Sequence, residues 1–385
     1  MSLSLFKGLS LSYFWYFSVL GLITPYLSVF LDSKGFSSLA IGEILAIVTA
    51  TRIVGPTLWA VVADKTGKQL PIIRLGSLLA CLSFLVLFWL QSYWSITFSL
   101  ALFSLFWTAI LPQLEVMTLN SIRRNAKIYS RIRLWGSIGF IAAAVITGEA
   151  IERFNANAFT VVGVIILLGL FFSTLQIKQP KIHASQQQKT SSIKTKFLHL
   201  GFMLFFVSGL LLQLSFGPYY GFFALFLRDL NYPGFAVGLL ISIGVIAEIV
   251  IFIIAGRLFK HFTIKQLLVF SMFVTAIRWY LMGNFGSSVW ILAVSQVIHA
   301  ASFGLYHTAS IQYIQRHFER SQQSRGQAIY IGGVYGLGGA MGAYVAGTLW
   351  LDGHGAITAF NFAAIMALSA ALIALFIPKD IQVRA

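Results

Sequence analysis

The sequence predicts an all-α membrane protein with twelve transmembrane helices in two pseudo-symmetric halves of six. Hydrophobic residues make up 58% of the 385 and charged residues only 10%, whereas soluble domains carry roughly 25% charged residues. Apolar runs of about 20 residues, the length that a helix needs to cross a bilayer, recur along the whole chain. One polar, low-complexity stretch, 179–196, falls near the middle of the chain and would join the two halves.

Short polar loops separate the apolar runs and so define the individual spans. The predicted spans are 11–31, 39–62, 73–90, 94–121, 132–151, 156–177, 198–227, 235–256, 266–283, 288–313, 327–351 and 354–377. No small-residue cleavage site follows the first span, so we expect no signal peptide. The single cysteine, Cys81, excludes a disulfide framework.

The formal net charge of +16 is distributed unevenly between the loops. Most of the 27 lysines and arginines fall in the loops of one side, including both ends of the chain. This is the positive-inside pattern, and it predicts a multi-pass protein of the bacterial inner membrane with cytoplasmic N- and C-termini. The charge is therefore a topology signal. Membrane lipid is the expected partner of the surface, and nucleic-acid binding is not expected.

The two predicted halves resemble each other. A shift of 196 positions, without gaps, lays Phe30 on Phe226 and Gly42 on Gly238. Internal repeats of this size build many secondary transporters, which bind substrate near the midplane. The predicted domains are an N-terminal half, a cytoplasmic linker and a C-terminal half, at 1–177, 178–197 and 198–385.

The loop after the second span has a recognisable pattern. It resembles the signature loop of the major facilitator superfamily, Gly-x-x-x-Asp-Arg/Lys-x-Gly-Arg/Lys, with Ala60 in place of the first glycine. A short charged turn of this kind can cap a helix end and pair with neighbouring cytoplasmic helix ends. An ordinary charged turn is the alternative. The residues assigned to this gating loop are Asp64, Lys65, Gly67 and Lys68.

Glu115 and Arg133 lie inside consecutive spans joined by a basic loop. At 1.5 Å of rise per residue, they sit at comparable depth. One interpretation is a structural ion pair that holds this hairpin. The other is that the planar guanidinium group of Arg133 binds a substrate anion, with Glu115 as its alternate partner.

Glu248, Arg278 and His299 fall in the middle thirds of the eighth, ninth and tenth spans. Ionisable groups at this depth cost at least about 2.5–3.5 kcal/mol each, so they line a cavity or pair with one another. They are candidates for proton coupling, in which a movable partner controls the protonation of Glu248. The alternative is a static Glu248–Arg278 pair with a core histidine. His307 lies nearer the cytoplasmic end and is expected to be structural.

Three further residues are candidates for the substrate cavity. The repeat places the deep Arg52 at the position that Glu248 holds in the second half. Tyr16 and Tyr220 belong to aromatic clusters on the first span of each half. Most rings in these clusters should pack against helices or lipid, but a few would face a cavity and could stack on a flat apolar substrate.

With these residues located, the whole chain resembles the phenylpropionate permease group of the major facilitator superfamily, which is related in turn to lactose permease. The motifs that carry the resemblance include 13–17, 133–137 and 219–222, together with Glu248, Arg278 and His299. The separation of 18 residues between Glu115 and Arg133 matches the sugar-binding hairpin of lactose permease. Phe140, Gln296 and Ser302 depart from that permease, which makes galactoside an unsuitable substrate.

The resemblance implies proton symport of a small aromatic carboxylate such as 3-phenylpropionate, with Arg133 or Arg52 holding the carboxylate. The alternative is proton symport of a neutral sugar or nucleoside. No Gly-Pro efflux motif, metalloprotease motif or appended signalling domain is evident, so an antiporter, an enzyme and a sensor are not expected. We expect no cofactor and no metal, and the proton is the expected coupling ion. The chain is expected to be monomeric.

Overall fold

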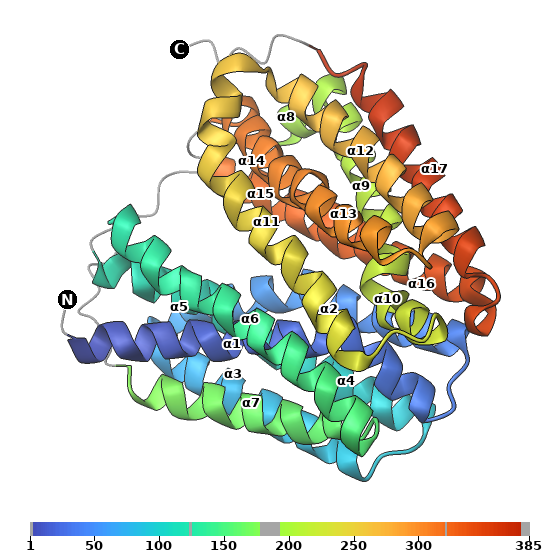
Figure 1. Cartoon of the computed structure of the whole chain (residues 1–385). Coiled ribbons are helices and arrows are strands. Elements are labelled where there is room, and N and C mark those ends of the chain that lie inside the picture. Colours follow the sequence, from blue (N-terminus) through green and yellow to red (C-terminus); the bar gives the residue numbers. More distant parts are fainter. Residues whose placement is uncertain (1–2, 123–124, 178–192, 320–321, 379–385) are drawn as a thin grey trace. The chain divides into compact units, whose positions relative to one another are not determined.

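The computed structural model describes residues 3–122, 125–177, 193–319 and 322–378, and every regular element within them is a helix (Figure 1). The chain forms two compact units. The first comprises Met1–Ala184 with Phe223–Leu239, and the second comprises Ser185–Phe222 with Leu240–Ala385. Most of the predicted linker, 178–192, lies outside the described residues. The domain boundaries drawn from the sequence therefore stay a prediction.

Seven α-helices and one 3₁₀ turn belong wholly to the first unit. They are α1 (Leu3–Ser33), α2 (Ser38–Thr66), α3 (Gln69–Leu85), η1 (Val86–Phe88), α4 (Tyr93–Trp107), α5 (Ile110–Ser121), α6 (Ala126–Phe154) and α7 (Ala158–Leu175). The first unit also includes the end of α10 (Gly217–Asp229) and the beginning of α11 (Gly234–His261).

The remaining elements belong to the second unit. They are α8 (Lys194–Phe197), α9 (Leu200–Ser215), α12 (Ile264–Phe285), α13 (Val289–His299), η2 (Ala300–Leu305), α14 (Tyr306–His317), α15 (Gln323–Tyr330), η3 (Ile331–Gly338), α16 (Gly339–Trp350), η4 (Leu351–Gly353) and α17 (Ala356–Ala374). Two of these, η2 and η3, are π-helical segments inside longer spans.

The described residues contain twelve helical segments long and apolar enough to cross a membrane, from Ser4–Ser33 to Ala356–Ala374. Each coincides with a predicted span, and the ends agree within about two helical turns. The prediction of an all-α membrane protein with twelve spans is confirmed.

Close contact between α1 and α6 organises the first unit. A side chain at Gly21 would collide with the backbone of Phe140, and one at Gly139 would collide with the carbonyl of Phe14. Ser18 donates hydrogen bonds to the Phe14 and Gly139 carbonyls at 2.8 and 3.1 Å. Glycine on both helices thus allows the backbones to approach, a common mode of helix packing in membranes.

In the second unit, α17 packs against α12 and α9 (Figure 1). The buried face of α17 is a row of alanines, which lets the larger side chains of its neighbours fill the space between the helices. These alanines are Ala356, Ala359, Ala363, Ala367, Ala370, Ala371 and Ala374.

Candidate functional site

A cluster of aromatic side chains in the first unit surrounds Arg52 on α2. Tyr16 of α1 stacks on Trp107 of α4, with centroids 4.7 Å apart and planes 9° from parallel. The Arg52 guanidinium carbon lies 5.5 Å from the centre of a Trp107 ring. The Nε of Arg52 is buried and has no hydrogen-bond partner among the described residues. Arg52 is thus a cation held beside aromatic rings, with donor capacity left over.

Arg133 on α6 is held in the same manner. Its guanidinium carbon lies 3.8 Å from the centre of the Phe17 ring and 5.9 Å from that of Tyr13, both on α1. A Cβ at Gly136 would come within 2.6 Å of Phe17 and 3.0 Å of an Arg133 nitrogen, so glycine there leaves room for the stack. Stacking on a ring face occupies neither edge of the guanidinium, so its N–H groups can still bind an anion.

Glu115 on α5 accepts a hydrogen bond from the Tyr129 hydroxyl at 3.3 Å. Its carboxylate oxygens form no ion pair with Arg133 within 4.0 Å, in contrast to the pairs that the described residues do form elsewhere. Glu115 and Arg133 both remain close enough to Tyr16 to influence it electrostatically. The structure therefore gathers four predicted candidates into one cluster: Arg52, Glu115, Arg133 and Tyr16. Glu115 and Arg133 do not form a static ion pair within it.

The second unit contains a separate network around His299. Its Nε2 lies 2.8 Å from the Glu248 carboxylate, and its Nδ1 lies 2.8 Å from Nη1 of Arg278. Glu248 comes from α11, Arg278 from α12 and His299 from α13. The structure thus brings the three predicted proton-coupling residues into one chain of contacts, in which Glu248 bonds to the histidine.

The protonation state of His299 follows from these partners. A guanidinium can only donate, so Nδ1 of His299 must accept from Arg278 and cannot carry a proton itself. Nε2 then carries the ring proton and donates it to Glu248. In this arrangement His299 is neutral.

Sequence reasoning did not assign roles to Tyr219 and Gln296, which complete this network. The Gln296 carbonyl oxygen accepts from the Tyr219 hydroxyl at 2.8 Å and from Nη2 of Arg278 at 3.4 Å. Arg278 is fully buried and lies 4.3 and 4.4 Å from the ring centres of Tyr219 and Trp279. Gln296 lies one turn before His299, and this spacing is a sequence signal that could have indicated its contact with the network.

The remaining predicted aromatic, Tyr220, stacks on Phe216 at 5.2 Å and 18°. It lies beside Tyr219, with ring centres 5.3 Å apart, so it borders the Glu248 network.

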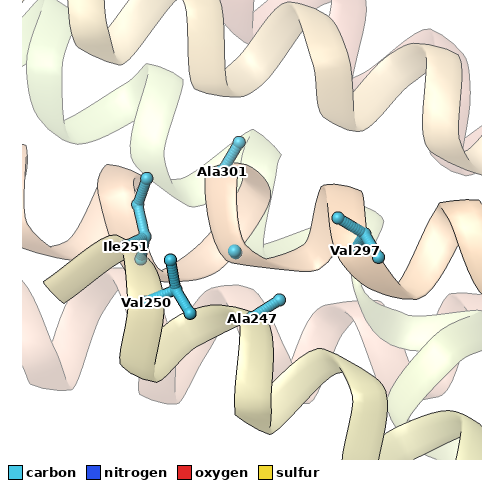
Figure 2. A pocket seen from close by; sticks show the side chains of 6 residues that line it. Ala247, Val250, Ile251, Val297 and Ala301 are labelled. Atoms are coloured by element: carbon cyan, nitrogen blue, oxygen red, sulfur yellow. The ribbon is translucent and has the colours of Figure 1, made fainter. Parts of the chain in front are cut away.

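The face of α11 that flanks Glu248 is apolar. A groove of about 330 Å³ lies between α11 and the α13–η2 segment, and Figure 2 shows the side chains that line it. Its lining is entirely aliphatic and comprises Ala247, Val250, Ile251, Val297, Ala300 and Ala301. Such a lining offers nothing to hold an anion or a proton.

The gating loop ends α2 with a tight turn. Gly67 adopts a left-handed conformation, with φ of 65°, and donates to the Ala63 carbonyl at 2.8 Å. Only glycine adopts this C-cap conformation at low cost, which explains the glycine of the motif. Lys65 and Lys68 are exposed. The side chain of Asp64 lies outside the described residues.

No group of three or more histidine, cysteine, aspartate or glutamate side chains could hold a metal ion within the part of the chain that the structure describes.

The profile of the MFS_1 like family matches residues 6–362. A protein of Escherichia coli (strain K12) described as "Probable 3-phenylpropionic acid transporter" is 29% identical over 368 residues, covering 94% of this chain and 96% of that one. The maltose permease of Geobacillus stearothermophilus is 27% identical and covers 88% of this chain and 86% of its own.

Solved structures show the same fold. The nucleoside transporter NupG superposes with a TM-score of 0.80 at 18% identity, covering 97% of this chain and 98% of that chain. A mutant form of NupG reaches a TM-score of 0.87 at 17% identity, with 97% and 100% coverage. At these identities the likeness concerns the fold alone.

Proposed function

The chain belongs to the MFS_1 like family, and from that premise we propose that it is a secondary transporter that takes up a small aromatic carboxylate together with a proton. The relatives and the fold are those of transporters and not of enzymes. The observation that carries the proposal is that Arg133 has no carboxylate partner within 4.0 Å among the described residues. Its guanidinium carbon lies 3.8 Å from the centre of the Phe17 ring instead.

A substrate with a carboxylate and a flat apolar body suits this cluster. The carboxylate would accept from the free edge of Arg133, since two parallel N–H···O bonds match guanidinium geometry. The ring would stack among the aromatic side chains of α1 and α4, near Tyr16 and Trp107. Arg52, with its unpartnered Nε, is the second cation available to the same anion. The 29% identical relative, whose name specifies an aromatic acid, supports this choice.

The proton would be carried by Glu248. While Arg278 donates to His299, the histidine stays neutral, so protonation of the network neutralises the carboxylate and weakens its bond to His299. Loss of that bond would free the α11 side chain from α13. A proton would thereby be linked to rearrangement of these helices, as a proton-coupled transporter of this family requires.

The neutral-sugar or nucleoside alternative is supported by the 27% identical maltose permease. A xanthosine permease of Escherichia coli (strain K12) is 23% identical and covers 56% of each chain. A neutral substrate would not use the uncompensated charge of Arg133. The two proposals therefore differ in whether binding depends on a negative charge.

Binding to the purified protein in detergent tests this difference. We expect 3-phenylpropionate to bind more tightly than its neutral amide. The substitution Arg133→Gln should remove about 2–3 kcal/mol of binding free energy for the acid, a loss of roughly 30- to 150-fold, and leave the amide unchanged. Arg131→Gln, two residues away and exposed, is the matched control. Tighter binding of uridine or maltose than of the acid would favour the alternative instead.

A further inference from the structure

His307 on α14 belongs to a column of stacked rings that begins at His299. The rings of His299 and Phe303 have centroids 5.6 Å apart and planes 11° from parallel, and those of Phe303 and His307 are 6.1 Å and 9°. Phe303 lies in the π-helical segment η2, between the two histidines. The sequence alone favours a structural role for His307. In the column, however, only the Phe303 ring lies between the His307 ring and His299 of the Glu248 network.

A second π-helical segment supplies the partner of His307. The Tyr335 hydroxyl of η3 lies 3.0 Å from Nδ1 of His307, and the Tyr335 ring meets Phe303 edge to face at 6.3 Å. Thus η2 and η3 meet at this histidine. Single π-helical turns inside α-helices occur frequently at functional sites.

Three buried hydroxyls continue from Tyr335 and interact with one another, although none forms a hydrogen bond of good geometry among the described residues. They belong to Tyr306, Ser310 and Tyr330, each at most 1% exposed. Tyr330 meets Tyr335 edge to face, with centroids 5.6 Å apart. Buried polar atoms are almost always partnered, and a hydroxyl both donates and accepts, so a group of them with unused capacity can pass protons along.

The groups that face His307 come from several helices. Glu248 of α11 acts electrostatically on both His307 and Tyr335. The Glu248 side chain also packs on Gly304, where an added Cβ would be 3.6 Å from its Cγ. From α13, His299 faces the column with Arg278 of α12 behind it. Tyr220 of α10 acts electrostatically on Tyr335, and Tyr330 of α15 packs against it.

The two histidines differ in the partner of Nδ1. In His299 this nitrogen accepts from the obligate cation Arg278, which excludes an imidazolium in this arrangement. In His307 it faces the neutral hydroxyl of Tyr335, which can accept as well as donate. Only His307 can therefore take up a proton without breaking the bond that it makes.

We propose that His307, oriented by Tyr335, is the group that exchanges protons with Glu248, and that Tyr306, Ser310 and Tyr330 line the remainder of the route toward the C-terminal end of α14. The inference rests on the proposed proton-coupled function. The proton leaves the Glu248 carboxyl group for Nε2 of His307, and the resulting imidazolium releases its Nδ1 proton through the Tyr335 hydroxyl. Glu248 is left as a carboxylate, and His307 is neutral again with its ring proton on Nε2 instead of Nδ1.

Infrared difference spectroscopy of the purified protein tests this without any substrate. The C=O band of the protonated Glu248 carboxyl is assigned by its loss in Glu248→Gln, and its hydrogen–deuterium exchange is then timed after transfer to D₂O. A positioned acid–base group accelerates proton transfer by roughly 10²–10⁴-fold, so we expect His307→Gln to slow exchange at least about tenfold. Tyr335→Phe should slow it to a smaller extent.

The control is His261→Gln, at an exposed histidine at the end of α11. It should exchange like the wild type, and thermal stability should show that all variants are folded. An unchanged exchange rate in His307→Gln would overturn the inference alone. If no band titrates and disappears in Glu248→Gln, then Glu248 is not the proton carrier, and the proton-coupled part of the proposed function fails together with the inference.

Discussion

Arg278 is a cation kept inside the second unit without a carboxylate within 4.0 Å among the described side chains. Two aromatic faces, a glutamine oxygen and a histidine nitrogen surround it. Each cation–π contact is worth about 0.5–2 kcal/mol, so together these contacts offset part of the desolvation of the guanidinium. The Glu248 carboxylate bonds to His299 instead.

Gln296 is expected to position the Arg278 side chain. Gln296→Leu would leave Nη2 of Arg278 and the Tyr219 hydroxyl without their shared acceptor, at a cost of about 1–3 kcal/mol to stability. Thermal unfolding in detergent measures the effect, with the exposed Gln327→Leu as control. If both variants unfold at the wild-type temperature, Gln296 does not hold Arg278.

Phe17 is expected to support substrate binding through Arg133. Phe17→Leu keeps an apolar side chain but removes the ring face, so the affinity for 3-phenylpropionate should fall by about 0.5–2 kcal/mol, or roughly 2- to 30-fold. Isothermal titration measures this, with the exposed Phe98→Leu as control. Affinity that is unchanged in Phe17→Leu would contradict the role given to the Phe17–Arg133 stack.

The sequence indicated candidate residues better than it indicated their partners. Glu248, Arg278 and His299 could be singled out because ionisable groups at bilayer depth are costly. That Glu248 bonds to His299, and Glu115 to Tyr129, could not be predicted, since these contacts depend on how the helices rotate and pack. The stacking of Arg133 on Phe17 depends on the space left at Gly136, which only the structure shows.

The packing of α1 against α6 depends on glycine. Gly139→Ala would place a Cβ against the Phe14 carbonyl and force the two helices apart. We expect a loss of about 1–3 kcal/mol, the usual cost of overpacking, visible as a lower unfolding temperature. Gly256→Ala on α11, where an added Cβ meets nothing within 4 Å, is the matched control and should be neutral or stabilising. Equal behaviour of the two variants would contradict the close contact.

At the scale of elements, the predicted spans match the observed ones because hydropathy and length report directly on membrane crossing. The interruptions within spans were not predicted. The π-helical segments η2 and η3 place Phe303 and Tyr335 around His307. Local deviations of this kind are decided by packing, and they occur where functional groups meet.

An exposed ion pair joins two positions that the predicted repeat places in register. Asp32 and Arg228 are separated by 196 positions, the shift that aligns the two halves, and they form an ion pair of 2.6 Å within the first unit. Nearby, the Glu152 carboxylate accepts from the backbone N–H of Gly234 at 2.5 Å.

These contacts are expected to hold segment 223–239 against the rest of the first unit. Asp32→Asn and Arg228→Gln should each raise amide hydrogen exchange at 228–238, modestly, because exposed ion pairs contribute only about 0–1 kcal/mol. The double variant should add little to either single variant, since the contact is already lost. Fully additive effects would show that the two side chains act independently.

The central claim is proton-coupled uptake of an aromatic carboxylate, and the most direct test is uptake of radiolabelled 3-phenylpropionate into proteoliposomes. It is measured with an inward proton gradient and with the gradient collapsed, for the wild type, Glu248→Gln and the control Glu149→Gln. We predict gradient-dependent accumulation by the wild type and Glu149→Gln, and none by Glu248→Gln. Absence of uptake by folded, correctly inserted wild-type protein, or uptake indifferent to the gradient, would contradict the claim.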